Sequence, residues 1–387
     1  MINLAKAAVI AGMLLVLPGC WDMREAQNTN FITAIGVDYA QDHYVVYAQL
    51  IDFTSIAKRE SGDAQSKSGS KAIWVGKGEG KSMMAALNHI YDSSQQQTVW
   101  THVKAVILSE SVMKSKMGEV FSSILRSREM RYTPWIYGTR DSMEDLLSSM
   151  TLLNLSAQTT VMFEPTSIYR QSSDVEPIHL QRLMNGIREP ASTVLVPSIT
   201  SQNRIWTNAG KQPPLSRTDG LFVVSKNKLQ GYVPESKIRG TRFVKFYRVF
   251  RYPMTVNLPD SGNVLLLIRN PRTSMDINPE GEELQVTINL ITRANMIEKN
   301  TDETVSFQDI TEAGIQKIKD EIKASFEQGQ RENMDLLGLE EELYRKQNAV
   351  WKAAHDSGEP LLPRFKLKEV QVKLEINHAN TYTFRQK

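Results

Sequence analysis

The chain contains one cysteine, Cys20, which stands directly after a short apolar segment near the N-terminus. With a single thiol, no disulfide can form within the chain, and a structural zinc site built on several thiolates is excluded. Of the 387 residues, 41% are hydrophobic and 23% are charged, as is usual for globular proteins. We therefore expect two or three packed domains of about 150 residues each.

The N-terminal segment has the pattern of a signal peptide. Lys6 is followed by an uncharged apolar run from Ala7 to Leu17, which is shorter than the roughly 20 residues that span a bilayer. The run ends in Leu17-Pro18-Gly19-Cys20, which resembles the lipobox of bacterial lipoproteins, with Pro18 where Ala or Ser is more usual. We predict a signal peptide at residues 1–19, cleavage between Gly19 and Cys20, and S-diacylglycerol and N-acyl groups on Cys20.

Lipidation would assign a function to the only thiol. A thiolate is the nucleophile that forms a thioether to a diacylglyceryl group, and each buried methylene then contributes about 0.8 kcal/mol to membrane binding. The alternatives are a plain signal peptide with an incidental cysteine, or a buried N-terminal helix. Later apolar runs such as Val264–Ile268 are too short to span a membrane. We expect a soluble body held outside the cytoplasm by its lipid.

Strand and helix patterns alternate through the first half of the chain. Two β-rich runs, Phe31–Asp38 and His43–Ile51, flank the short segment Tyr39–Asp42 and predict a hairpin. Other elements are predicted as strands at 72–75, 103–108 and 132–138, helices at 81–95 and 116–126, a capping box at Ser142, and an exposed loop at 58–71. The first domain is therefore expected to be α/β or α+β.

The second half is predicted to be α+β. Five prolines between residues 171 and 214 leave that stretch unassigned, and we place an inter-domain connection at 202–216. We predict domains at 20–201 and 217–387, and a further division near residue 270 would give three. The overall class is mixed α+β, with mixed or antiparallel sheets covered by helices. The predicted strands are 220–225, 228–233, 242–250, 264–269, 283–292 and 370–376, and the predicted helices are 308–333 and 339–354.

The residue patterns favour no catalysis, cofactor, metal or nucleic-acid partner. A net charge of +3 with both signs spread along the chain does not indicate nucleic-acid binding. The segment Gly76–Ser82 is one residue too short for a P-loop, since Val75 stands where the first glycine is required, and we interpret it as a turn that opens a helix. The six histidines form no zinc-protease motif. We interpret Glu340–Glu342 as surface charges.

Two features leave a binding role open. His102 and Lys104 share one face of a predicted strand, where a structural histidine is favoured over a binding one. The helix at 308–333 has a polar face. Either the helix simply lies on a sheet with this face in solvent, or the face docks a partner subunit, and the first interpretation is favoured.

The residues after the predicted cleavage site resemble the Cys-Trp-Asp-x-Arg-Glu start of the spore germination C-subunit lipoproteins, the Ger(x)C family. They are Cys20, Trp21, Asp22, Met23, Arg24 and Glu25. Further segments resemble motifs of this family in the expected order along the chain. They are 33–38, 78–82, 102–110, 128–131 (with a shortened spacing), 219–224 with 229–232, and 335–339.

The resemblance implies a lipid-anchored, non-catalytic subunit of a nutrient germinant receptor, on the outer face of the spore inner membrane. It implies a three-domain mixed α/β body that forms a complex with an A-type subunit and a permease-like B-type subunit. The family offers no catalytic residues to carry over. We expect Trp21 at the lipid headgroups, with Asp22, Arg24 and Glu25 as the first polar residues above them.

Two other functions remain as alternatives. A solute-binding lipoprotein that delivers a ligand to a transporter would need a cleft between two lobes. A wall-active hydrolase would need a metal or a pair of acids, and the sequence offers neither pattern.

Overall fold

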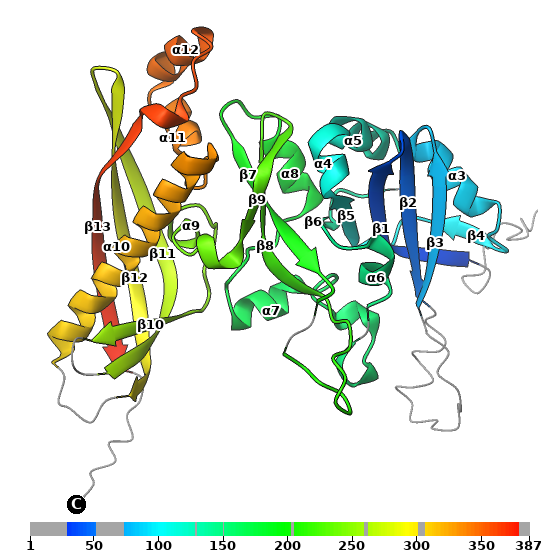
Figure 1. The fold of residues 1–387 in the computed structure, drawn as a ribbon, viewed down its shortest axis with the longest axis horizontal. Coiled ribbons are helices and arrows are strands. Elements are labelled where there is room, and N and C mark those ends of the chain that lie inside the picture. The colour runs from blue at the N-terminus through cyan, green and yellow to red at the C-terminus, as the bar shows by residue number, and fades with distance from the viewer. Residues whose placement is uncertain are drawn as a thin grey trace, which may run out of the picture.

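The structure, a computed structural model, is an elongated body with two β-sheets side by side (Figure 1). It describes residues 29–51, 73–127, 130–149, 151–202, 205–258, 262–300 and 306–378. The short helix α9 (Thr241–Val244) lies between the two sheets. Within these residues, no helix is long and apolar enough to cross a membrane.

The first sheet has nine strands among the described residues, in the order β3-β2-β1-β5-β6-β7-β8-β9, with β4 beside the start of β1. The central strands β1, β5, β6 and β7 run parallel, and the strands at both edges are antiparallel to their neighbours. The predicted mixed α+β class is confirmed. The strands are β1 (Thr29–Ala40), β2 (His43–Ile51), β3 (Ile73–Gly80), β4 (Gln97–Val99), β5 (Ala105–Ser109), β6 (Trp135–Thr139), β7 (Thr193–Thr200), β8 (Arg217–Ser225) and β9 (Lys228–Pro234).

The two hairpins of this sheet form where the sequence predicts them. β1 and β2 are joined by Gln41 and Asp42, whose φ angles are +50° and +61°. β8 and β9 are joined by Lys226 and Asn227, whose φ angles are +51° and +59°. A positive φ at both central residues is the signature of a type I′ turn, whose twist matches that of the strands it connects.

Helices cover both faces of the first sheet. One face packs under α3, α5 and α8, and the other under α6 and the short helices that follow it. The amphipathic pattern at 116–126 predicts α5 correctly, because Val120, Phe121 and Ile124 are buried. Ser142 caps α6, as its sequence predicts, by accepting the Asp145 N–H. The helices are α3 (Met83–Tyr91), α4 (Glu110–Ser115), α5 (Met117–Arg126), α6 (Met143–Leu147), η2 (Leu152–Asn154), η3 (Ala157–Thr159), α7 (Pro165–Gln171) and α8 (Leu180–Gly186).

The sheet continues across the predicted inter-domain connection at 202–216. This segment joins β7 to β8, and these two strands pair with each other over their whole lengths. The hairpin β8–β9 therefore belongs to the first sheet, although the sequence assigns it to a domain at 217–387. The chain passes from one sheet to the other only between β9 and β10 (Tyr252–Leu258).

The strand predicted at 242–250 is wrong. The structure has the helical turn α9 there, followed by irregular chain up to residue 251. Thr241, Arg242 and Phe243 are all buried, at 0%, 1% and 2% exposure. Successive side chains of a strand point to opposite faces, so a half-covered strand cannot bury three in a row.

The second sheet has the order β10-β11-β12-β13. Its first three strands are antiparallel, and β13 returns parallel to β12 after the helices α10 to α12. Val370 and Leu374 of β13 are buried while Gln371 and Lys373 are exposed, which confirms the predicted alternation. The remaining elements are η4 (Glu235–Lys237), β11 (Gly262–Glu280), β12 (Glu283–Asn300), α10 (Phe307–Glu332), α11 (Leu339–Lys346), α12 (Asn348–Asp356), η5 (Leu362–Arg364) and β13 (Phe365–His378).

The long helix α10 lies along the second sheet (Figure 1). Its predicted apolar stripe is confirmed, because Ile318 and Ile322 are fully buried, and Ile315 and Phe326 pack against the same core. The single helix predicted at 339–354 is two helices, separated at Gln347, whose φ and ψ of −138° and 59° are not helical.

One hydrophobic core joins the two sheets. Leu221 and Val233 of the first sheet belong to the same buried cluster as Phe243 and Val249 of the connecting segment and Leu266 of the second sheet. Burial of apolar area is the main favourable term in folding. The connecting segment is therefore part of the core, and the sheets pack through it.

The glycines of β3 allow α3 to lie against the strand. A Cβ atom at Gly78 would lie 2.1 Å from the backbone oxygen of Ala86, whereas one at Gly76 would lie 3.3 Å from a methyl group of Ile90. The segment at 76–82 thus has a packing function.

We predict that Gly78→Ala lowers the free energy of unfolding by about 1–3 kcal/mol, measured by urea denaturation, because the backbone of α3 cannot move away from the added methyl group. Gly76→Ala is the matched control, and an equal loss there would contradict this account.

Candidate functional site

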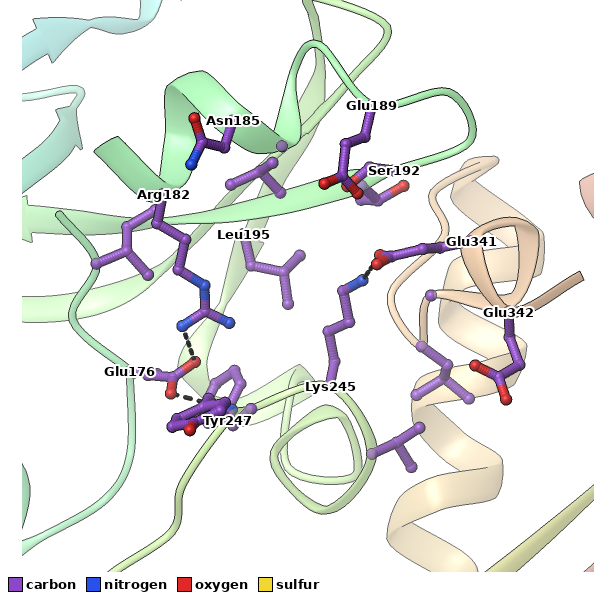
Figure 2. Close-up of a pocket in the computed structure, with 18 of the residues that line it drawn as sticks. Glu176, Arg182, Asn185, Glu189, Ser192, Leu195, Lys245, Tyr247, Glu341 and Glu342 are labelled. Carbon is purple, nitrogen blue, oxygen red and sulfur yellow. Dashed lines mark hydrogen bonds and ion pairs between the residues drawn. The ribbon is translucent and has the colours of Figure 1, made fainter. Parts of the chain in front are cut away.

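A cleft of about 610 Å³ lies between the two sheets. One wall is formed by α8 and β7, and the other by the start of α11 (Figure 2). Lys245, Phe246 and Tyr247 of the connecting segment form its base. Its polar lining residues are Glu176, His179, Gln181, Arg182, Asn185, Glu189, Ser192, Thr193, Lys245, Tyr247, Glu341, Glu342 and Arg345.

Ion pairs connect the walls of the cleft. Lys245 Nζ lies 2.5 Å from Glu341 Oε2, and both side chains are less than one-fifth exposed. Arg345 Nη2 lies 2.7 Å from Glu341 Oε1 and 3.6 Å from Glu189 Oε2, which is on the opposite wall. The Arg345–Glu189 pair is more than half exposed and contributes little to stability. The Lys245–Glu341 pair, which is shielded from water, therefore determines the geometry of this end of the cleft.

Glu176 fixes the other end. Its Oε2 atom lies 3.0 Å from Arg182 Nη1, and its Oε1 atom accepts the backbone N–H groups of Tyr247 and Arg248 at 3.0 and 3.3 Å. Burial raises the pKa of this carboxyl group, and Arg182 and the two N–H donors lower it in part. A single side chain thus holds α8 and the connecting segment together.

Asp335 shapes the wall that carries Glu341. Its carboxylate is buried and accepts the N–H groups of Gly338, Leu339 and Glu340 at 2.8, 2.9 and 3.0 Å, which satisfies the first turn of α11. Gly338 has φ of +76°, and a Cβ atom there would lie 2.8 Å from Lys245 Nζ. The segment 335–339 therefore positions the helix and leaves room for the lysine that pairs with Glu341.

Arg242 joins the two sheets beneath the cleft. Its guanidinium lies 3.5 Å from the carboxylate of Asp174 in the first half and 3.7 Å above the ring of Tyr252 in the second sheet. Tyr252 in turn lies 3.3 Å from both carboxylate oxygens of Glu321 on α10. The arginine is 1% exposed, so removal of either type of partner would leave a buried charge poorly compensated.

Backbone contacts add to this joint. The Ser173 hydroxyl accepts the N–H groups of Phe250 and Arg251 at 3.0 and 3.1 Å. The Gly240 N–H donates to Ser325 of α10 at 3.0 Å, and a Cβ at Gly240 would lie 2.1 Å from the backbone oxygen of Glu321. We define this set of contacts around Arg242, Ser173 and Gly240 as the inter-sheet joint.

The predicted lipidation site and the motif near it lie outside the described residues. This holds for Gly19, Cys20, Trp21, Asp22, Arg24 and Glu25, and for the loop predicted at 58–71. Their assignments stay predictions.

His102 and Lys104 line one cavity, although the strand predicted from residue 103 begins only at Ala105 and both residues precede it. This cavity of about 310 Å³ also involves Phe31, Gln158 and Phe163. The His102 ring packs edge-on against Phe31 at 4.7 Å, and Lys104 Nζ donates to Gln158 at 3.4 Å. These contacts fit the structural interpretation of His102. In the described part of the chain, no three His, Cys, Asp or Glu side chains are grouped closely enough to hold a metal ion.

Sequence reasoning missed the residues of the cleft. It interprets Glu340–Glu342 as solvated charges, whereas the Glu341 side chain is only 15% exposed. The pairs Lys245–Glu341 and Arg182–Glu176 connect residues that are distant or irregularly spaced in the chain. The one available signal was the Asp335–Leu339 motif, which marks the turn that forms the wall.

Two family models match the chain. "Spore germination protein N-terminal domain" matches residues 22–201, and "Spore germination B3/ GerAC like, C-terminal" matches residues 219–380. Together they cover most of the sequence and define a spore germination protein of the GerAC type. The chain belongs to the Ger(x)C family.

Relatives agree with this assignment. The chain is 23% identical to "Putative spore germination protein YfkR" of Bacillus subtilis (strain 168) over 337 residues, which are 86% of this chain and 85% of that protein. It is 22% identical to "Spore germination protein KC" of the same organism over 226 residues, 55% and 54% of the two chains. The crystal structure of the GerBC protein has the same fold, with a TM-score of 0.51 and 15% identity over 88% of this chain and 96% of that one.

We predict that Asp335→Ala lowers the free energy of unfolding by about 1–3 kcal/mol, because three buried N–H groups lose their acceptor. Urea denaturation would measure the loss. Asp335→Asn keeps the oxygen that accepts from Gly338 and Leu339 and should lose less. Asp356→Ala, at the exposed aspartate that ends α12, is the matched control. Equal stability of Asp335→Ala and the control would contradict the capping role.

Glu321 makes the joint sensitive to pH. Burial raises its pKa, while Arg242, Lys317, Arg239 and the Tyr252 hydroxyl lower it in part. A raised pKa in the folded state stabilises the fold fully below the unfolded value of about 4.3, and this contribution is lost as the pH rises through the folded value.

We therefore expect Glu321→Gln to lose less stability than the unchanged protein between about pH 4 and pH 7. Urea denaturation at a series of pH values would measure the difference. Glu327→Gln, at an exposed position of the same helix, should leave the profile unchanged. Parallel profiles for Glu321→Gln and the unchanged protein would show that Glu321 does not carry this dependence.

Proposed function

We propose that the chain is the non-catalytic C-type subunit of a nutrient germinant receptor. The observation that carries this proposal is the match of both family models, which together span residues 22–380 except for the loop between β7 and β8. In this proposal the subunit joins an A-type and a B-type subunit at the spore inner membrane and is required for the response to nutrients.

The proposal includes a lipid anchor on Cys20. The apolar run before it has signal-peptide length and ends in a sequence that resembles a lipobox. The S-diacylglycerol group alone carries two acyl chains, which would give stable membrane attachment, whereas a single chain would not.

The cleft is better explained as part of the joint than as a solute site. Its charged side chains pair with one another, as Lys245 does with Glu341 and Arg182 with Glu176. A polar solute would have to replace these contacts, and burying unpaired charges is costly. The pairing therefore favours the receptor-subunit proposal over the alternative of a solute-binding lipoprotein.

Germination of spores that carry Cys20→Ala tests the proposal. We expect the altered protein to carry no fatty acid after metabolic labelling, and the spores to lose the response to at least one nutrient in a panel. A trigger that bypasses nutrient receptors should still germinate them, and spores with the gene deleted should behave in the same way.

Two results would contradict the proposal in different ways. Absence of incorporated fatty acid from the unchanged protein after metabolic labelling would refute the anchor. Normal germination of the deletion strain on every nutrient, in a strain lacking its paralogues, would refute the receptor role.

A further inference from the structure

An exposed apolar surface, which we call the apolar tip, lies where two loops of the first sheet meet. One loop carries η2 and η3, and the other joins β7 to β8; both extend toward the lower edge of Figure 1. They enclose a groove of about 330 Å³ that contains one charged residue, Arg217, among its described lining residues. The tip consists of Leu152, Leu153, Leu155, Ile168, Ile205 and Trp206, each at least 41% exposed.

Leu153 is the most exposed of these side chains, at 90%. Its backbone has φ of 57° and ψ of 22°, which is the left-handed region that residues with a bulky side chain rarely adopt. The leucine side chain lies in water, so no free energy of burial within this chain compensates for its strained backbone. Strain of this kind is typical of residues that have a function in binding.

The two loops of the tip carry basic residues and no acid, and Glu164 follows the first loop at the start of α7. Residues 151–163 contain no charged side chain, and residues 205–217 contain Lys211 and Arg217 but no acid. Leucine, isoleucine and tryptophan beside basic residues are the composition of surfaces that lie in the interface of an anionic bilayer. The tip therefore complements a lipid surface in both polarity and charge.

The tip also lies near the place where the chain enters the body. Gln158 of the tip loop and Phe163, which follows η3, line the same cavity as Phe31 in the first strand. Residues 20–28 connect Cys20 to that strand and reach on the order of 30 Å when fully extended. With the anchor proposed above, the bilayer surface is within reach of this side of the first sheet.

We propose that the apolar tip inserts into the headgroup region of an anionic bilayer and gives the body a second attachment beside the lipid on Cys20. Leu153 and Trp206 enter the boundary between headgroups and acyl chains, and Lys211 and Arg217 lie against the lipid phosphates. The proposal rests on the lipid anchor for its geometry, and its test separates the two.

The test uses the mature lipidated protein on vesicles of phosphatidylcholine with phosphatidylglycerol. Lipidation consumes the only native thiol, so Leu153→Cys provides a single site for an environment-sensitive fluorophore. Ile297→Cys is the matched control, because Ile297 is an exposed apolar residue on β12 of the other sheet. Flotation of the lipidated protein, compared with that of the Cys20→Ser protein, reports the anchor independently of the fluorophore. The same labels are read on Cys20→Ser protein with excess vesicles.

We expect a several-fold rise and a blue shift of emission at position 153, none at position 297, and a smaller response without phosphatidylglycerol. Leu153→Glu should weaken vesicle binding of the Cys20→Ser protein, whereas Ile297→Glu should not.

Flotation with an aqueous signal at position 153 would refute the tip and keep the anchor. A response at position 153 with equal flotation of the lipidated and the Cys20→Ser protein would support the tip and refute the anchor. A response that needs membrane proteins from spores would assign the tip to a protein partner and overturn the proposal.

Discussion

The arrangement of the two sheets depends on a buried arginine. Arg242 contacts Asp174 from one half of the molecule and Tyr252 from the other, and it is almost completely withdrawn from water. Burial of the guanidinium has a desolvation cost, which Asp174 and Tyr252 offset only while both stay in place, so the arginine restricts how the two sheets can be arranged. The contacts of Ser173 and Gly240 fix the backbone on either side. The connecting segment is consequently part of the hydrophobic core, and it packs the two sheets into one elongated body.

The cleft follows from this joint. Because Glu176 holds the backbone of Tyr247 and Arg248, and Asp335 fixes the start of α11, Lys245 and Glu341 meet in a shielded position. An ion pair with little exposure is more sensitive to geometry than one on the surface. A partner subunit that binds one wall of the cleft would therefore also change the position of the other wall, because the ion pairs connect the two. The family motif at 335–339 is explained by this packing role rather than by chemistry.

The sequence predicted what local patterns determine. The turns at Gln41–Asp42 and Lys226–Asn227, the alternation in β13 and the stripe on α10 each depend on neighbouring residues, and each is confirmed. It failed at 242–250, where three consecutive buried residues reflect contacts with distant elements. The pairing of β7 with β8 across the loop at 202–216 is likewise a long-range property. The family models divide the chain at the same place as our predicted boundary. The first sheet, however, continues across this boundary, and the division into domains stays a prediction.

The apolar tip shows why exposed sites are hard to predict. Ile205 and Trp206 stand in a loop without periodicity, and Leu153 is recognisable only when its exposure and backbone angles are known. A single lipid anchor would leave an elongated body free to rotate about its attachment point. A second contact on the first sheet would remove that freedom, and the second sheet would then stand at a defined side of the anchor. In the proposed arrangement, orientation at the membrane is a property of the loops of the first sheet, and the inter-sheet joint transmits it to the second.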